Sequence, residues 1–348
     1  MLEFRTLALT QVPWDELDRF ADRTVFQTRE WLEFIAETQN GKPVVAELWA
    51  GGARVGYFSG VLIRKLGVKI LGSSFPGWAT PYIGFNLLPN TVSRTEALEG
   101  LRRWAFGELK CLHFEVADWY FRNESTQAAG LDATAYTSYE SDLTQSEDDL
   151  FGKMDSACRR CIRKAEKSGV TIEHASDAGF ADEYYEQLKD VFAKQGRVPT
   201  YDLERVRSLV RHMQPTGRVL LVRARDPEGQ TIATGIYPGL NEVAYFWGNA
   251  SWRAGQQWRP NEALHWYAMR YWKQQGVKYF DWGGGGGYKE KYGVLPLSVP
   301  WFYKSKYRIM TVARNETREL YYRSQKLIGW LQGVSGQPAA AATKQTES

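Results

Sequence analysis

The chain has 348 residues, of which 43% are hydrophobic and 24% charged, a composition typical of a globular protein with enough residues for two lobes. No stretch approaches the roughly 20 consecutive apolar residues of a membrane span, and the first residues lack the basic and apolar regions of a signal peptide. Three cysteines do not form a disulfide framework, so we expect a cytoplasmic protein with reduced thiols.

Residues 1–140 are predicted to alternate short strands with two amphipathic helices. The apolar side of the first helix, "TREWLEFIAET", holds Trp31, Phe34 and Ile35. Two alternating runs joined by a Gly-Gly turn then predict a β-hairpin. The second helix, at 93–109, begins at Ser93 with Glu96 three residues later, which is the spacing of a capping box.

Residues 141–312 repeat the same order of helix, antiparallel hairpin, strand, helix and strand. We therefore predict an α/β fold of the mixed α+β kind, with one lobe at 1–140 and a second at 141–312. A further helix is predicted at 313–332, and the polar, low-complexity residues 333–348 are expected to be disordered.

Four segments carry a resemblance to a known family: "FQTREWLEF", "IRKAEKSGV", "GNASWRAGQQWRPNEALHWYAM" and "YFDWGGGGGYKEKYG". In this order and spacing the chain resembles the FemABX-like group of GNAT-type N-acyltransferases over residues 20–310. Members of that group join amino acids to peptidoglycan precursors, and related acyltransferases belong to polysaccharide and envelope pathways. The resemblance implies two GNAT-like (acyl-CoA N-acyltransferase) lobes in tandem, each a mixed sheet flanked by helices, with the donor and acceptor site in the C-terminal lobe.

One position departs from the pattern of this group. Some peptidoglycan-precursor transferases have a phosphate-binding lysine after the early tryptophan, where this chain has Ile35. The difference argues against a nucleotide-sugar peptide as the acceptor.

The segment after the last predicted core strand supplies the candidate catalytic residues. By resemblance, Lys289 of "YKEKYG" matches a Phe-Lys-x-x-Phe-Gly pattern, with Tyr in place of Phe, and stabilises the charge that develops on the reacting carbonyl. Asp281, at the carboxyl end of its strand, is a candidate base or orients the amine; the alternative interpretation is a cap for loop N–H groups. Tyr288 is placed to donate a proton or to stack.

The candidate substrate-binding residues lie in three predicted segments. By resemblance, the loop "QGRVPTYD" borders the acceptor groove, where Arg197 would hold a carboxylate or phosphate beside Tyr201. Alternation in "AYFWGNAS" places Tyr245, Trp247 and Asn249 on one face of a strand. The resemblance implies that this strand flanks the acyl group. Arg253 and Asn261 flank the start of a helix at Pro260, where GNAT proteins bind the CoA pyrophosphate. The alternative interpretations are surface arginines, a core strand and an ordinary strand-to-helix loop.

A basic helix, "CRRCIRKAEK", is predicted to present Arg159, Arg163 and Lys167 on one side and an apolar side opposite. The basic side would contact phosphates of an aminoacyl-tRNA or of a lipid-linked acceptor, or else it is a solvated face. The two cysteines of this segment have no second pair, so we predict no metal. The four histidines show no spacing for a catalytic dyad, which gives no support to a covalent intermediate.

We therefore expect a metal-independent N-acyltransferase in which an amine of a cell-envelope sugar or peptide precursor attacks an activated acyl carbonyl. No cofactor is expected to be bound permanently; the donor is acyl-CoA or aminoacyl-tRNA, and the absence of a charged helical arm in the second lobe leans towards acyl-CoA. Besides the envelope precursor, tRNA and the inner membrane surface are candidate partners. Two alternatives stay open: a tRNA-dependent peptidoglycan-bridge transferase, and a non-catalytic GNAT-like protein that binds nucleic acid or an envelope precursor.

Overall fold

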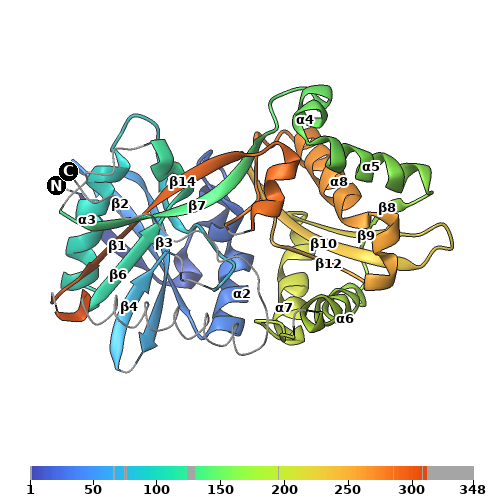
Figure 1. Ribbon diagram of the computed structural model, residues 1–348. Helices are drawn as coiled ribbons and strands as arrows, with labels where there is room; N and C mark the ends of the chain where they lie inside the picture. The colour runs from blue at the N-terminus through green and yellow to red at the C-terminus, as the bar shows by residue number, and fades with distance from the viewer. Residues whose placement is uncertain are drawn as a thin grey trace, which may run out of the picture.

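One β-sheet connects the two halves of the chain in the computed structural model (Figure 1). The structure describes residues 2–311 except 66, 74, 76, 124–129, 195, 285 and 308. The helix predicted at 313–332 and the tail predicted at 333–348 lie outside the described residues.

The sheet has 14 strands, of which 12 follow one another in a single path. The strands are β1 (Glu3–Leu7), β2 (Lys42–Ala50), β3 (Ala53–Lys65), β4 (Val68–Gly72), β5 (Gly84–Leu87), β6 (His113–Ala117), β7 (Asp132–Asp142), β8 (Thr171–His174), β9 (Val219–Arg225), β10 (Thr231–Leu240), β11 (Val243–Tyr245), β12 (Gly248–Ser251), β13 (Tyr279–Asp281) and β14 (Leu295–Ser305). Their order is β1-β2-β3-β4-β6-β14-β7-β13-β11-β10-β9-β8, with β5 paired to β3 and β12 paired to β10.

Helices cover both faces of this sheet. They are α1 (Trp14–Leu17), α2 (Arg29–Gln39), α3 (Arg94–Gly107), α4 (Glu147–Lys153), α5 (Ser156–Lys167), α6 (Phe180–Ala193), α7 (Leu203–Met213) and α8 (Pro260–Gln274). In the C-terminal half, α4, α5 and α8 lie on one face of the sheet and α6 and α7 on the other (Figure 1). Helix α2 packs against α7, so that one apolar core is built from both halves.

The predicted internal repeat is confirmed by the strand pairing. In the first half, β3 pairs with β4 and β5, helix α3 follows, and β6 returns parallel to β4. In the second half, β10 pairs with β11 and β12, helix α8 follows, and β13 returns parallel to β11. Each half is thus a mixed sheet flanked by helices, in the same topology.

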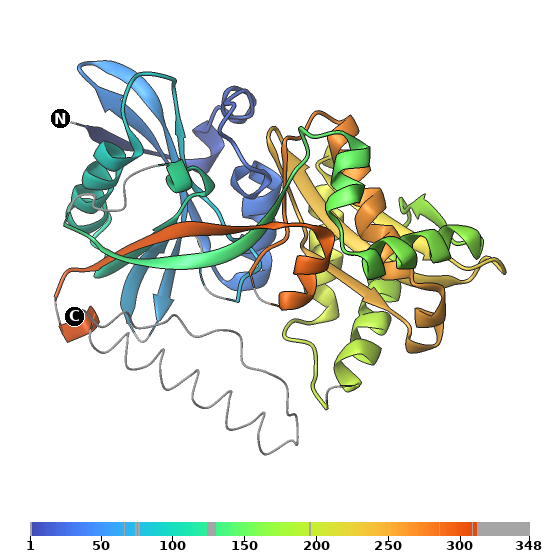
Figure 2. The ribbon, with the colours of Figure 1, turned by 45° about the horizontal axis from the view of Figure 1, so that its top comes forward.

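The two halves are joined by their longest neighbouring strands. Strands β7 and β14 pair antiparallel from Asp132–Tyr303 to Glu140–Leu295, and they run side by side from one half to the other (Figure 2). Strand β14 also pairs with β6 of the first half, whereas the end of β7 pairs with β13 of the second. The lobe boundary expected at residue 140 stays a prediction, since both strands run between the halves.

Several local predictions are confirmed and one element was missed. The apolar side of α2 is fully buried, and Ser93 and Glu96 form the predicted capping box of α3. The buried face of α5 consists of Cys158, Ile162 and Ala165, as its pattern predicts. Helix α4, which Ser146 caps, is the element that the sequence pattern does not predict, because its sequence is mostly acidic and polar.

No helix in the described part of the chain is both long and apolar enough to cross a membrane.

Candidate active site

The strand predicted over "EVAYFWGNAS" is interrupted, and this break is the centre of the candidate site. The Phe246 N–H donates to the Asp281 carbonyl (2.8 Å), which completes the parallel pairing of β11 with β13. The next N–H, of Trp247, donates to Ile236 of β10 (3.2 Å), and the Trp282 N–H donates to Tyr139 of β7 (2.8 Å). The two parallel strands therefore part beyond Asp281, and backbone groups next to the break are left facing each other across it.

The break also corrects one prediction. The side chains of Tyr245 and Trp247 belong to the core between the sheet and α6, together with Ala250. Asn249 instead donates to Asn261 on α8 (3.0 Å), which lies on the opposite face. The strict alternation that places Asn249 beside Trp247 is wrong, because the interruption of the strand shifts the alternation by one residue.

The corresponding position of the N-terminal half is closed. After β4, the Ser73 N–H donates to the Glu115 carbonyl of β6 (3.0 Å). The Ser73 hydroxyl donates to the Ala117 carbonyl (3.0 Å) and accepts from the Ala117 N–H (2.7 Å). The ring of Phe75 then covers Gly72 at a distance that leaves no room for a Cβ. In the described part of the first half, the Ser73 side chain thus bridges the two strands and Phe75 covers Gly72.

The glycine-rich loop after β13 bends sharply at the break. Gly283 has a φ of +69°, and a Cβ at this position would lie 2.6 Å from the Tyr245 hydroxyl. Both the left-handed backbone and the lack of space restrict this position to glycine. The loop ends in a short 3-10 helix, Gly287–Tyr292, which carries Tyr288 and Lys289.

Lys289 points back under this loop. Its Nζ donates to the carbonyls of Gly283 and Gly284, both at 3.0 Å, and to that of Trp282. The side chain is 4% exposed. Burial lowers the pKa of Lys289 to about 8, and the nearby Asp281 carboxylate opposes this shift. The ammonium group is therefore close to its titration point near neutral pH, an environment often found at functional sites.

Asp281 is completely buried beside the same loop. Its carboxylate accepts hydrogen bonds from the Tyr82 hydroxyl (2.7 Å), the Ser138 hydroxyl (2.5 Å) and the Gly283 N–H (2.7 Å). Burial raises the pKa of Asp281, whereas the three donors and Lys289 act in the opposite direction. The contact with Gly283 corresponds to the interpretation of Asp281 as a cap of the loop.

The remaining two groups near the loop differ in accessibility. Tyr288 is 52% exposed, with its ring 5.9 Å from Lys289 Nζ. His265 of α8 is buried beneath the break, with Nδ1 3.0 Å from the Tyr237 hydroxyl. Burial lowers the pKa of His265 to about 3, so this imidazole is neutral at physiological pH and acts as part of the packing.

Aromatic side chains line the face of the break that lies towards α6. The rings of Tyr201 and Trp247 are 5.3 Å apart, and the Tyr201 and Tyr184 hydroxyls are hydrogen-bonded at 2.8 Å. The indole Nε1 of Trp247 is buried and has no hydrogen-bond partner among the described residues. Arg197 lies in the loop before Tyr201, and its side chain is exposed. The sequence analysis predicted Arg197 and Tyr201 at an acceptor groove and Trp247 on a strand beside the acyl group; within the described residues Tyr201 and Trp247 are in contact, and no contact of Arg197 with either is present.

The start of α8 lies on the other side of the break. Asn261 accepts from Asn249 and donates to Ser251 (3.2 Å), which links β12 to the first turn of the helix. Pro260 occupies the first turn as predicted, and the N-cap residue Arg259 provides no side-chain cap. Arg253 lies in the preceding 3-10 turn, with its backbone N–H bound to Asp190 (2.9 Å) and its side chain exposed.

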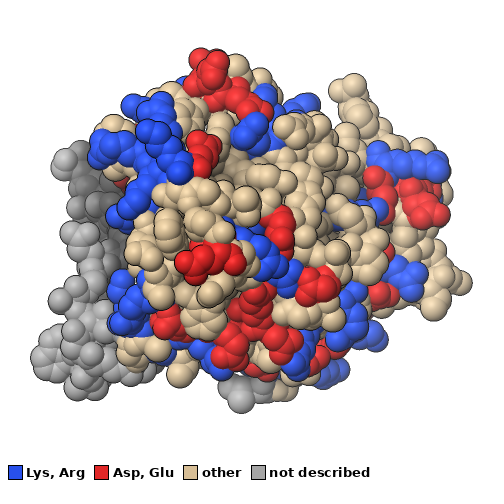
Figure 3. Space-filling view, turned by 90° about the vertical axis from the view of Figure 1, so that its right-hand side faces the viewer, with Lys and Arg blue, Asp and Glu red and all other residues tan. Residues whose placement is uncertain are grey.

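The basic side of α5 is exposed at Arg163 and Lys167, and Asp155, the N-cap residue of this helix, donates its N–H to the Lys291 carbonyl (2.9 Å). Arg159 donates to the Gly152 carbonyl (2.7 Å) and to that of Met154, so it stabilises the preceding turn. Arg163 stacks over Phe151 (5.2 Å), and Lys167 is exposed. On the side of the molecule that includes α5, Lys and Arg side chains gather into areas of basic surface (Figure 3).

Sequence reasoning missed Tyr82 and Ser138. Both reach Asp281 from other parts of the chain: Tyr82 from the loop before β5 and Ser138 from β7. No motif marks either residue; the only signal was that Tyr82 belongs to an irregular, aromatic loop between two strands. As for metals, no group of three His, Cys, Asp or Glu side chains is arranged as a ligand set within the described ranges.

Comparison with known proteins finds similarity to one family model and to several solved structures. The family model described as Acetyltransferase (GNAT) domain matches residues 152–292. A search of curated proteins finds no match. A crystal structure of FemX is similar with a TM-score of 0.68 and 13% identity, covering 85% of this chain and 96% of that one. A conserved protein of unknown function from Bacteroides thetaiotaomicron VPI-5482 is similar with a TM-score of 0.55 and 12% identity, covering 88% of this chain and all of that one.

At these identities the two structures establish the fold, while the family model covers the half of the chain in which the strands part. The residues that it matches include α5, the interrupted strand, α8 and the loop up to Tyr292. Residues 152–292 therefore match the GNAT acetyltransferase domain model, and the chain has the fold of FemX.

Proposed function

We propose that the C-terminal lobe transfers an acyl or aminoacyl group from an activated donor to an amine of a cell-envelope precursor. The observation that carries the proposal is the buried Lys289 ammonium under the loop that begins where β11 and β13 part. A positive charge held by fixed backbone carbonyls in a site of low exposure is suited to stabilise an oxyanion.

The reaction consists of one acyl transfer. The amine nitrogen attacks the carbonyl carbon of the thioester or ester, the new C–N bond forms, and the carbonyl oxygen takes the negative charge. The C–S or C–O bond then breaks, the amine gives up a proton, and the thiol or hydroxyl leaving group accepts one. Lys289 Nζ would give up its hydrogen bond to the outermost carbonyl, that of Gly284, and bind the oxyanion instead. The negative charge of the oxyanion would then be neutralised without a covalent enzyme intermediate.

For the donor, we propose that the acyl carrier lies along the break, with its phosphates at the start of α8. The support is the N-terminal turn of that helix, which has Pro260 in its first turn, no side-chain cap, and the exposed side chain of Arg253 in the turn before it. Acyl-CoA and aminoacyl-tRNA both present phosphates there. Because Arg163 and Lys167 on the basic side of α5 are exposed, they would be available to the phosphates of the larger donor.

For the acceptor substrate, the aromatic pair Tyr201 and Trp247 supports a sugar or a peptide. Such a molecule presents an amine for the reaction and a group that accepts a hydrogen bond from the unpartnered indole Nε1 of Trp247. Ile35, which replaces a phosphate-binding lysine of some relatives, is completely buried in the core. This residue cannot hold a pyrophosphate, which supports an acceptor other than a nucleotide-sugar peptide.

The proposal is tested by offering the purified protein acetyl-CoA, longer acyl-CoAs or charged tRNA together with amino-sugar and lysyl-peptide acceptors. The mass of the acceptor is then measured. Addition of the acyl mass to an amine is expected with one donor class, and the Trp247→Phe variant should raise the KM of the acceptor, since it removes the indole N–H and keeps an aromatic ring. Binding of acceptors without transfer from any donor would favour the non-catalytic alternative.

A further inference from the structure

The Tyr82 hydroxyl extends from the N-terminal lobe to the candidate site. Tyr82 belongs to the first half of the chain and is 1% exposed, and its hydroxyl donates to Asp281 Oδ2 (2.7 Å). The other carboxylate oxygen, Oδ1, accepts from the Gly283 N–H (2.7 Å). The carbonyl of the same Gly283 accepts from Lys289 Nζ (3.0 Å). A continuous series of hydrogen bonds thus runs from the first lobe to the ammonium group.

Tyr82 is held from its own side by several contacts. Its backbone carbonyl accepts from the Thr24 hydroxyl (3.3 Å), and its ring meets Phe26 edge to face. Three residues later, the Phe85 N–H donates to Asp118 (3.1 Å), which anchors the start of β5.

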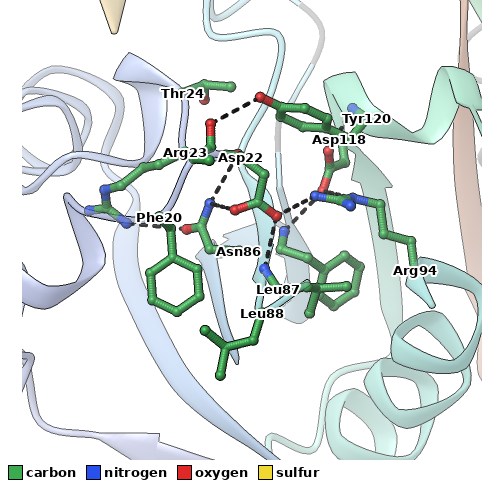
Figure 4. Close-up of polar contacts among 12 residues, drawn as sticks. Phe20, Asp22, Arg23, Thr24, Asn86, Leu87, Leu88, Arg94, Asp118 and Tyr120 are labelled. Carbon is green, nitrogen blue, oxygen red and sulfur yellow. Dashed lines mark hydrogen bonds and ion pairs between the residues drawn. The ribbon is translucent and has the colours of Figure 1, made fainter. Parts of the chain in front are cut away.

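A buried network of charges supports that anchor (Figure 4). The Arg94 guanidinium binds Asp22 (2.6 Å) and Asp118 (3.3 Å). Asp22 also accepts from the Leu87 N–H (2.8 Å), so both carboxylates hold the backbone of β5. The segment that presents Tyr82 is therefore fixed to the first lobe on its C-terminal side, where two backbone N–H groups of β5 donate to carboxylates that Arg94 pairs with.

We propose that Tyr82 is a positioning residue: by holding the Asp281 carboxylate, it makes the N-terminal lobe set the position and the charge state of Lys289. The inference rests on the proposed role of Lys289. It assigns a function to a lobe whose own strand break is closed by Ser73 and Phe75. Loss of the hydroxyl frees the carboxylate to turn, which releases the Gly283 N–H and the carbonyl that binds Lys289.

Other ionisable groups lie near this series of hydrogen bonds. From β7, Glu140 pairs with Asp281 across the strands and forms an ion pair with Arg122; burial raises the pKa of Glu140 to about 7. From α8, the neutral His265 faces Lys289. From the 3-10 helix, Lys291 is neutralised by Glu262 (2.7 Å), and Tyr288 stacks near Lys289. Asp281 accepts from the N–H of Gly283 in the loop that caps the ammonium.

The test compares Tyr82→Phe with Tyr120→Phe. Tyr120 also carries a hydroxyl from the first lobe to a carboxylate of the second, Glu242 (3.3 Å), but it has no contact with the loop. Both changes keep the ring. Titration of Lys289 is followed by NMR in protein labelled at the lysine side-chain carbons, with the signal assigned through Lys289→Arg.

In the unchanged protein we expect the Lys289 ammonium group to titrate with a midpoint near pH 8. Asp281→Asn removes the charge that raises the pKa of Lys289 and should lower the midpoint by about 0.5–1 unit. Tyr82→Phe should move it in the same direction and lower kcat about tenfold with little change in KM, while Tyr120→Phe leaves both unchanged.

An unchanged midpoint and an unchanged kcat in folded Tyr82→Phe would overturn the inference. If Tyr82→Phe does not fold, Ser138→Ala, which removes the other hydroxyl donor to Asp281, takes its place with the same expected direction. If the unchanged protein transfers no acyl group, the proposed function fails, and the inference about Tyr82 is then decided by the Lys289 titration alone.

Discussion

A Cβ on Gly283 would lie 2.6 Å from the hydroxyl oxygen of Tyr245. Gly283, at the start of the glycine-rich loop, is thus in direct contact with Tyr245 of the neighbouring strand β11. Gly283 also links Asp281 to Lys289, since its N–H donates to the Asp281 carboxylate and its carbonyl accepts from Lys289 Nζ.

The first prediction follows from this contact. Gly283→Ala should lower the free energy of unfolding by about 2–5 kcal/mol, because it combines a left-handed backbone with overpacking against Tyr245. Chemical denaturation measures the loss. Gly287→Ala is the matched control: it stands in the same glycine run, and its Cβ would have no neighbour nearer than 3.7 Å. Equal stability of the two variants would contradict the geometry of the loop.

The activity should depend on pH through Lys289. Burial lowers the pKa of this group to about 8, so its charge is present below pH 8 and is lost as the pH rises through that value. If the ammonium stabilises the oxyanion, kcat falls above this pKa, and the slope of log kcat against pH corresponds to the loss of one proton. The pH–rate profile between pH 6 and 10 measures this. A constant kcat across that range would show that the charge of Lys289 is not used.

Stability should respond to acid through His265. Burial lowers the pKa of this imidazole to about 3, against 6.5 for an ordinary histidine. Between these values the unfolded chain binds a proton that the folded protein does not bind, so the free energy of unfolding falls as the pH decreases, by about 1.4 kcal/mol per unit. His265→Gln should make the dependence between pH 6.5 and 4 shallower by that slope, as measured by denaturation at each pH. Parallel curves for the two proteins would rule out this contribution.

The basic side of α5 distinguishes the two donor classes. Arg163 and Lys167 are exposed, whereas Arg159 is engaged with backbone carbonyls. If charged tRNA is the donor, Arg163→Ala with Lys167→Ala should weaken tRNA binding and reduce the slope of log Kd against log salt concentration by about 1.4–1.8. The double change of Arg102 and Arg103, which are exposed on α3, serves as a control of equal charge. An identical effect of both pairs would indicate non-specific attraction.

Local sequence patterns predicted much of the fold. The capping box at Ser93, the buried side of α2 and the apolar side of α5 depend on residues three or four positions apart, so a linear sequence displays them directly. The repeat of the two halves was visible for the same reason, as an order of local elements.

The centre of the site was less accessible to such reasoning. The interruption after Tyr245 changes the face of Asn249, and its local signal is weak: a single glycine, Gly248, within a strand pattern. The contact of Tyr82 with Asp281 joins residues 199 positions apart, and it depends on how the two lobes pack, which no local pattern encodes. Lys289 was found through its resemblance to a family motif, whereas its three carbonyl partners required the backbone of the glycine-rich loop.

The most direct test of the account is the turnover number of Lys289→Ala beside that of Lys291→Ala. Lys291 lies two residues further along the same 3-10 helix and forms an ion pair with Glu262. With the donor and acceptor identified by mass, kcat should fall about a hundredfold in Lys289→Ala and stay close to that of the unchanged protein in Lys291→Ala. Full turnover by folded Lys289→Ala would contradict the claim that this buried ammonium group stabilises the transition state.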